Sequence, residues 1–134
     1  MQMQELFDKM VEGLNKQKAI STRPATWDED VLMCAYRAEN GNRCAVGMLI
    51  PDDLYVPELE GRPAASSEIF DVLGIDYDQE FEFKCFLNDA QTMLHDNFQE
   101  QGWSQIEWEE NVHLCAQRFK LVNPLTKENT NADT

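Results

Sequence analysis

The sequence predicts an α+β domain, mostly helical, in which three or four α-helices pack over a small antiparallel β-ribbon. Several segments repeat apolar residues with the period of a helix. Asn40-Gly41, a strong signal for a two-residue hairpin turn, separates two apolar runs at 31–37 and 44–50. Because a two-stranded ribbon cannot bury its own apolar faces, helices must cover it. We expect one globular domain over residues 1–122, followed by a flexible tail over residues 123–134.

The first element is an amphipathic helix over Met3–Lys18. Its apolar residues recur with helical spacing and form one stripe: Leu6, Phe7, Met10, Val11 and Leu14. Ser21–Pro24 ends this helix, since proline cannot continue it. Thr26–Glu29 (TWDE) matches a capping box, so that either a short helical turn or a charged turn feeds the first strand.

The expected hairpin pairs Val31–Arg37 with Cys44–Ile50. Gly47, inside the second strand, indicates close approach of a helix backbone to the ribbon. A two-residue loop would place Cys34 and Cys44 on opposite faces of the ribbon and disfavour a disulfide between them. A three-residue loop would reverse that placement.

A short helix and a segment with two interpretations follow the hairpin. Ser66 or Ser67 can cap a helix that Gly74 ends. Ile75–Phe83 (IDYDQEFEF) then alternates apolar and acidic residues, which is typical of a strand. The same acidic residues would also suit the first turn of the next helix, because the helix dipole favours negative charge there. The sequence leaves both interpretations open.

Two further helices complete the domain. The clearer one spans Phe81–Glu100 and ends at Gly102; its stripe comprises Phe83, Phe86, Leu87, Ala90, Met93, Leu94 and Phe98. Ser104–Glu107 (SQIE) is a capping box that starts the last helix. The apolar face of that helix holds Trp108, Val112, Cys115, Ala116 and Phe119.

Charge is distributed unevenly along this acidic chain, whose formal net charge is −14. Residues 44–117 hold sixteen acidic residues and only two basic ones, Arg62 and Lys84, so this segment carries the whole net charge. Direct binding to nucleic acid or to an anionic membrane is disfavoured, because both need clustered Lys and Arg. No apolar run approaches the ~20 residues that span a bilayer. Since the N-terminus also lacks the pattern of a secretory signal, we expect a cytoplasmic protein.

Three short motifs stand out. Residues 34–37 read Cys-x-Tyr-Arg, and residues 44–55 read Cys-Ala-x-Gly-x-Leu-Ile-Pro-Asp-x-x-Tyr. The third, Gln91-x-x-x-His95-Asp96, lies on the long helix. Over residues 30–120 the chain resembles a family of small, mostly uncharacterised proteins of tailed phages and bacteria. The resemblance implies a fold and a phage context, with the host cytoplasm as the location, but no activity.

His95 is the strongest candidate for a catalytic residue. Asp96 would not orient its ring, because adjacent helix residues point about 100° apart. We expect His95 to meet Asp52, Asp53 or Tyr55 from the loop after the hairpin, either as the general base or metal ligand of a small hydrolase or metal-dependent enzyme, or as a structural hydrogen bond. The structural role is favoured, since no nucleophile or second base accompanies His95 in the sequence.

The sequence predicts neither a metal nor another cofactor. The candidates for a zinc site are Cys34, Cys44, Cys85, Cys115, His95 and His113. Structural zinc sites usually contain a close pair such as Cys-x2-Cys, and this chain has none. Scattered cysteines among apolar neighbours are typical of buried free thiols.

The acidic middle of the chain favours a protein-interaction module. Asp76, Asp78 and the following acids, if extended, would form a row with charges about 7 Å apart, similar to alternate phosphates of a nucleic-acid strand. The predicted partner-binding residues are Asp76, Asp78, Glu80, Glu82, Glu100, Glu107, Glu109 and Glu110. The expected partner has a basic surface, such as a host nucleic-acid-binding or defence protein, which nucleic-acid mimicry would inhibit. A merely solvated face and a self-associating structural domain are the alternatives, and the oligomeric state stays open.

Overall fold

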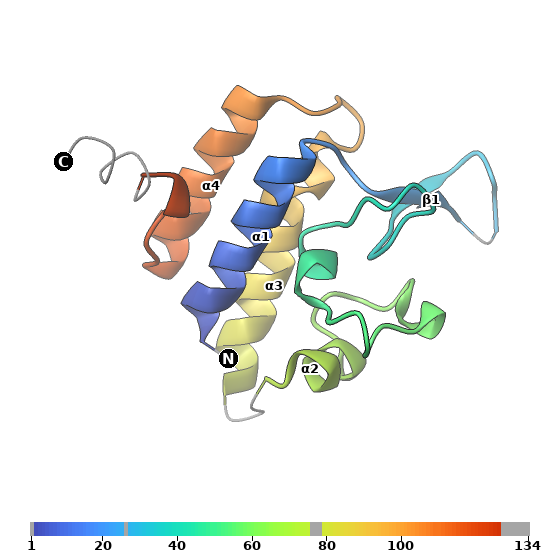
Figure 1. Cartoon of the computed structure of the whole chain (residues 1–134), viewed down its shortest axis with the longest axis horizontal. Helices are drawn as coiled ribbons and strands as arrows, with labels where there is room; N and C mark the ends of the chain where they lie inside the picture. Colours follow the sequence, from blue (N-terminus) through green and yellow to red (C-terminus); the bar gives the residue numbers. More distant parts are fainter. Residues whose placement is uncertain (1, 26, 76–78, 127–134) are drawn as a thin grey trace.

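The computed structural model describes residues 2–25, 27–75 and 79–126. It confirms the predicted fold class, a mostly helical α+β fold with a two-stranded antiparallel sheet (Figure 1). The elements, with η for a 3₁₀ helix, are α1 (Met3–Gln17), β1 (Thr22–Pro24), β2 (Leu32–Cys34), η1 (Val46–Leu49), η2 (Pro57–Leu59), α2 (Ser67–Leu73), α3 (Glu80–Leu94), η4 (Asp96–Phe98) and α4 (Gln105–Phe119). No helix in the described ranges is long and apolar enough to cross a membrane.

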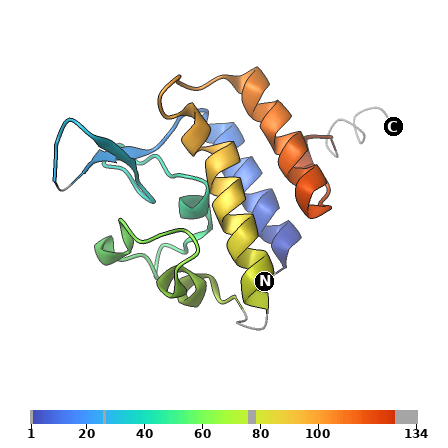
Figure 2. The same cartoon turned by 180° about the vertical axis from the view of Figure 1, so that it is seen from behind.

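Three long helices form one side of the molecule. α1 and α3 run in the same direction, and α4 runs back beside them (Figures 1 and 2). Phe86 of α3 lies between the other two helices. Its ring centroid lies 6.3 Å from that of Phe7 in α1 and 5.4 Å from that of Phe119 in α4, both in edge-on contact. The hairpin, η1, η2 and α2 form the other side of the molecule (Figure 1).

The sequence predicted α1, α2 and α4 correctly. All five residues of the α1 stripe are buried. The side-chain oxygens of Ser66 and Ser104 accept hydrogen bonds from the third backbone N–H of α2 and α4, as N-caps do. Gly74 ends α2 with a φ of 68°, a left-handed conformation that glycine adopts without strain.

The long helix is shorter than predicted. α3 ends at Leu94 rather than Glu100, and the 3₁₀ helix η4 follows it. His95 has the non-helical angles φ −138° and ψ −63°, and its ring turns into the protein interior instead of continuing the helix. Phe98, the last residue of the predicted stripe, is nevertheless buried.

The hairpin is formed by a different pair of segments than predicted. β2 lies within the predicted first strand, but its partner β1 precedes it in the sequence. The register pairs Thr22 with Cys34 and Pro24 with Leu32. The expectation that 31–37 pairs with 44–50 is therefore wrong.

A charged turn connects β1 to β2, which was one of the two expectations for the TWDE segment. The side chain of Asp28 accepts a hydrogen bond from the N–H of Asp30 (2.9 Å), and its carbonyl accepts one from Val31 (3.1 Å). Asp side chains favour such turns because they bond to the backbone two residues on. Thr26 of this segment lies outside the described residues.

The predicted second strand is a buried 3₁₀ segment. η1 packs against α1, and the Asn40-Gly41 turn before it is present, with a φ of 90° at Gly41. No ladder follows this turn among the described residues. A short run that is apolar throughout suits a buried strand and a buried helical turn equally, because it has no periodicity to separate them.

Two predicted segments lie partly outside the described residues. Within 75–83, residues 76–78 are outside, and α3 begins at Glu80, so Glu80 and Glu82 belong to a helix. Within the predicted tail, residues 127–134 are outside. Leu125 packs against the core, and its N–H donates to the side chain of Asn123 (2.9 Å).

Gly47 lies against the backbone that follows β2. A Cβ at position 47 would lie 2.9 Å from the carbonyl carbon and 3.0 Å from the Cα of Tyr36, and closer still to the carbonyl oxygen. The predicted close approach thus exists, but it brings Gly47 to the segment after β2 and not to a helix. The contact fixes how η1 sits on that segment.

Gly47→Ala should lower the free energy of unfolding by about 1–3 kcal/mol, because the new methyl group meets backbone that cannot move aside alone. Urea denaturation measures this change. Gly13→Ala is the matched control: its Cβ would meet the flexible end of the Met48 side chain, and alanine is the better helix former. Equal losses in the two variants would contradict this interpretation.

Candidate functional site

A hydrogen-bonded network joins the C-terminal end of α3 to the two strands. Gln91 lies on the last turn of α3, and His95 and Asp96 follow the helix end. On the opposite side, Ser21 directly precedes β1 and Cys34 ends β2. These five residues come from three separate parts of the chain, and the polar side chains that connect them are largely buried.

His95 is fully buried, and both of its ring nitrogens are engaged. Nε2 accepts a hydrogen bond from the backbone N–H of Ser21 (2.8 Å), and Nδ1 lies 2.8 Å from Oδ1 of Asp96. Because Nε2 accepts, the neutral ring carries its proton on Nδ1 and donates it to Asp96. The expectation that Asp96 would not orient the ring is wrong, since α3 ends before His95 and the helical offset of about 100° does not apply.

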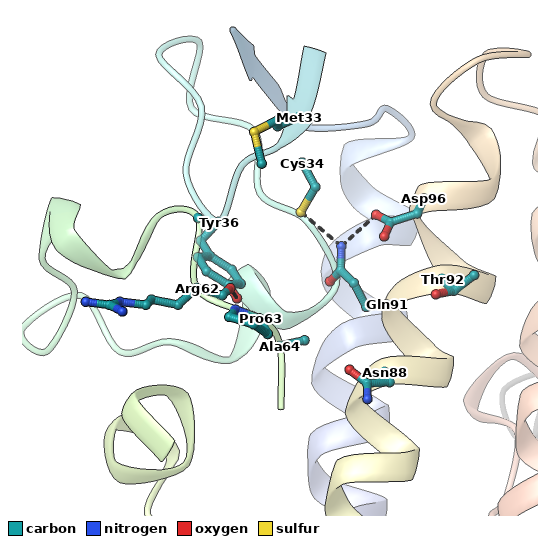
Figure 3. A pocket seen from close by; sticks show the side chains of 11 residues that line it. Met33, Cys34, Tyr36, Arg62, Pro63, Ala64, Asn88, Gln91, Thr92 and Asp96 are labelled. Atoms are coloured by element: carbon teal, nitrogen blue, oxygen red, sulfur yellow. Dashed lines mark hydrogen bonds between the residues drawn. The ribbon is translucent and has the colours of Figure 1, made fainter. Parts of the chain in front are cut away.

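Gln91 connects three segments through one side chain, which is 6% exposed. Its Oε1 accepts from the backbone N–H of Val46 (2.9 Å). Its Nε2 donates to Oδ1 of Asp96 (2.9 Å) and to Sγ of Cys34 (3.2 Å), as the dashed lines in Figure 3 show. Buried polar atoms of this kind need partners, and here both ends of the amide have them.

The end of α3 is held from the other side by α4. Trp108 Nε1 donates to the carbonyl of Leu94 (3.1 Å), and Asn111 Nδ2 donates to the carbonyl of Met93 (2.8 Å). The last carbonyls of a helix have no partner within the helix itself. These two side chains satisfy them and let α3 end early, so that His95 can turn into the network.

The Cys34 thiol faces the network and is strongly disfavoured as a thiolate. Its pKa is raised far above the usual range, first by a hydrogen bond with the Cys44 thiol, then by burial and by the negative charges of Asp96 and Glu60. Cys34 and Cys44 are therefore adjacent free thiols, not residues on opposite faces of a ribbon. The expected separation fails because Cys44 precedes a 3₁₀ helix instead of belonging to a strand.

The other motif residues form a second, structural cluster around Arg37. Its Nη2 donates to the carbonyl of Ile50 (3.1 Å) and to Asp52 (2.7 Å), and its guanidinium lies 4.4 Å from the ring centroid of Tyr55. Hydrogen bonding from Arg43 and the nearby charge of Arg37 hold the pKa of Asp52 below its usual range. The cluster fixes the loop after η1 onto the segment after β2.

His95 does not meet the residues proposed for an enzymatic site. Asp52 has a largely exposed side chain that pairs with Arg37 and Arg43, and Tyr55 donates to Glu60 (2.6 Å). Asp53 is exposed. The expectation that His95 contacts Asp52, Asp53 or Tyr55 is therefore wrong, because the two groups belong to separate clusters.

Two of the six candidates for a zinc site, Cys34 and His95, come together in the structure, and Asp96 joins them. Single ligand atoms of Cys34, His95 and Asp96 lie within 4.8 Å of one another. However, a metal ion needs an unprotonated ring nitrogen. Binding at Nδ1 would move the proton to Nε2, which would then face the N–H of Ser21 donor to donor. The arrangement suits a hydrogen-bond network better than a metal centre.

The predicted partner-binding residues lie at separate places in the structure. Glu82 lies in the first turn of α3, whereas Glu100 lies beyond the other end of that helix. Glu107, Glu109 and Glu110 lie in the first turns of α4, and Glu100 lies in the segment that leads into α4. Figure 1 shows this segment and the start of α4 at the same end of the molecule. We call Glu100, Glu107, Glu109 and Glu110 the acidic end; all four are exposed.

The structure says less about the other predicted partner-binding residues. Asp76 and Asp78 lie outside the described residues, and Glu80 is described by its backbone only. Since Glu80 and Glu82 lie in α3, the extended row with charges about 7 Å apart does not form at these two positions.

Reasoning from sequence missed Ser21 and Cys34 as members of the network. Gln91 offered one usable signal: it occupies a position on the buried stripe of α3, between Leu87 and Leu94, where an uncharged polar residue needs a buried partner. No local pattern marks Ser21, because its contribution is a backbone N–H.

Comparison with family models, with curated proteins and with solved structures gave no match to this chain. The resemblance to small phage and bacterial proteins therefore stays a prediction.

His95→Ala should lower the free energy of unfolding by about 3 kcal/mol, because it leaves a cavity and an unpaired Ser21 N–H. Chemical denaturation measures the change. His113→Ala is the control, since His113 is exposed on α4 and its loss should matter by less than about 0.5 kcal/mol. A His95 variant as stable as the His113 variant would contradict the structural role.

Cys34 should react slowly with iodoacetamide although it lines an open hollow. The thiolate is the reactive form, and the raised pKa keeps the thiol protonated across the neutral range. Between pH 7 and pH 9, alkylation of the urea-unfolded chain should accelerate while Cys34 of the folded protein stays nearly unmodified, as peptide mass spectrometry would show. Modification of folded Cys34 at the rate of the unfolded chain would exclude this protection.

Proposed function

We propose that this protein is a non-enzymatic interaction module that binds a partner with a basic surface through its acidic end. One observation carries the proposal: four exposed glutamates lie in a stretch of the chain that contains no Lys or Arg. No Lys or Arg occurs in the sequence between Lys84 and Arg118, and Arg118 is itself paired with Asp89 (3.1 Å).

The partner class follows from charge. Clustered Lys and Arg are the mark of nucleic-acid-binding proteins, whose basic surfaces an acidic protein can occupy. Attraction between opposite charges speeds association and weakens as salt screens it. A host defence protein of this class is the specific partner that we propose for a phage context, and its inhibition would follow from blocking the nucleic-acid surface. An extended, phosphate-like row is not part of this proposal, since Glu82 lies in α3.

An enzyme centred on His95 has weaker support. Both nitrogens of the ring are hydrogen-bonded inside the protein, so the ring offers neither a base nor a free ligand atom. Asp52, its supposed partner, is held by two arginines. Binding through the acidic end, in contrast, needs only exposed glutamates and no unoccupied buried group.

The test is capture of bacterial cytoplasmic proteins by the tagged protein at low and high salt. A specific basic partner should bind at low salt and be released at high salt. Reversal of the acidic end (Glu100→Lys, Glu107→Lys, Glu109→Lys, Glu110→Lys) should abolish its binding, because the surface would then repel it.

The matched control reverses four exposed acids elsewhere: Glu12→Lys, Glu29→Lys, Glu39→Lys and Glu58→Lys. It changes the net charge equally but spares the acidic end, so binding should largely persist. Equal loss in both variants would show that net charge alone governs binding, and no loss in either would refute the proposal. Melting temperatures confirm that both variants fold.

A further inference from the structure

A hollow of about 400 Å³ opens between α3 and residues 61–64 (Figure 3). Cys34 and Gln91 lie at its inner side, and Tyr36 forms part of its wall. Asp96 lines this hollow and also a neighbouring depression that Glu100 lines. The hollow therefore adjoins a depression that Glu100, one of the four residues of the acidic end, lines.

Asp96 is held in place as a hydrogen-bond acceptor. Its Oδ1 accepts from His95 Nδ1 (2.8 Å) and from Gln91 Nε2 (2.9 Å). In the part of the chain that the structure describes, its Oδ2 has no hydrogen-bond partner, and the side chain is 38% exposed. Two buried donors thus fix one oxygen and leave the other available to a donor from outside, with little conformational freedom left to lose on binding.

Asp96 is the acidic residue that lines the hollow, and Arg62 is the basic one. Arg62 contributes to the rim, but its side chain points away from Asp96 (Figure 3). Burial raises the pKa of Tyr36 well above its usual range, and interactions with Cys44, Cys34, Glu60 and Asp96 raise it further. Tyr36 and Cys34 consequently stay uncharged at neutral pH, and the carboxylate of Asp96 is the group that a bound cation would meet.

We propose that this hollow receives the guanidinium group of an arginine side chain from the basic partner, with Oδ2 of Asp96 as its acceptor. The inference rests on the proposed function, which supplies the arginine. A planar guanidinium suits a fixed carboxylate and can also lie against the ring of Tyr36. The apolar stem of the side chain would cross the rim near Pro63 and Ala64.

A small probe tests the hollow without any partner. N-acetyl-L-arginine amide carries the guanidinium as its only charge, and the matching citrulline amide has nearly the same shape without the charge. In ¹H–¹⁵N NMR titrations, the arginine probe should shift the side-chain amide of Gln91 and the backbone amide of Asp96 to saturation. Equal shifts with the citrulline probe would overturn the proposal.

Asp96→Asn is the sharpest variant. The asparagine oxygen can still accept from His95 and Gln91, so the network survives, while an amide group replaces the free oxygen. Binding of the arginine probe should weaken about tenfold or more, because a charge-assisted hydrogen bond is lost. Asp30→Asn, an equal charge change on the exposed hairpin loop, should have little effect. Equal affinities of the Asp96 and Asp30 variants would overturn the proposal.

Thr92→Lys is a second variant that tests the proposed site, and it leaves the hydrogen-bonded network unchanged. Thr92 is exposed on α3 and lines the hollow, so a lysine there would supply a cation from within and block the probe. Gln117→Lys on α4 is its charge-matched control. Unchanged probe binding in the Thr92 variant would contradict the proposed location.

The two proposals fail separately. If the arginine probe binds but capture yields no basic partner, the proposed function fails and the cation site stands. If a partner is captured through the acidic end and Asp96→Asn binds it as well as the original protein does, the cation site fails and the proposed function stands.

Discussion

The hydrogen bonds of Gln91, His95 and Asp96 are the interaction on which the rest of the structure depends. Among the residues that the structure describes, one side of the molecule contains two three-residue strands, two 3₁₀ helices and a short α-helix, none of which is stable alone. The other side is a bundle of three long helices that pack through Phe86. The network fastens the first side to the second at Ser21, Cys34 and Val46. Because its polar atoms are buried, any broken member leaves an unsatisfied group, which makes the connection specific as well as strong.

The residues that looked most like an active site thus make hydrogen bonds that hold the fold together. Arg37 and Asp52 hold the loop after η1, and His95 holds the end of α3. A histidine with both nitrogens bonded inside the protein is a connector, not a base. The groups of this chain that can interact with other molecules therefore lie at its surface, where an excess of carboxylates is exposed to solvent. A carboxylate acts there through long-range attraction, which is the basis of the interaction proposed above.

Asp96 links the interior with that surface. One of its oxygens belongs to the buried network, and the other lies free beside an open hollow that adjoins a depression lined by Glu100. The network therefore does two things at once: it joins the two sides of the fold, and it holds a carboxylate rigidly where a cation from a partner could reach it. Exposed glutamates such as Glu109 can attract a partner from a distance, but a fixed acceptor in a hollow can select one side chain.

The sequence by itself determined the elements whose signals are local. Helical stripes and serine caps placed α1, α2 and α4, because side-chain period and capping act within a few residues. The acidity of the segment from 44 to 117 is equally a property of the sequence. Only the tertiary structure decided which segment pairs with β2, because the apolar run at 44–50 has no periodicity to distinguish a strand from a buried turn. It alone decided where α3 ends, since the hydrogen bond between His95 and Ser21 spans 74 positions. It also decided that Asp96 has one free oxygen, because that depends on where Gln91 and His95 meet, and contacts between distant parts of a chain leave no local pattern in its sequence.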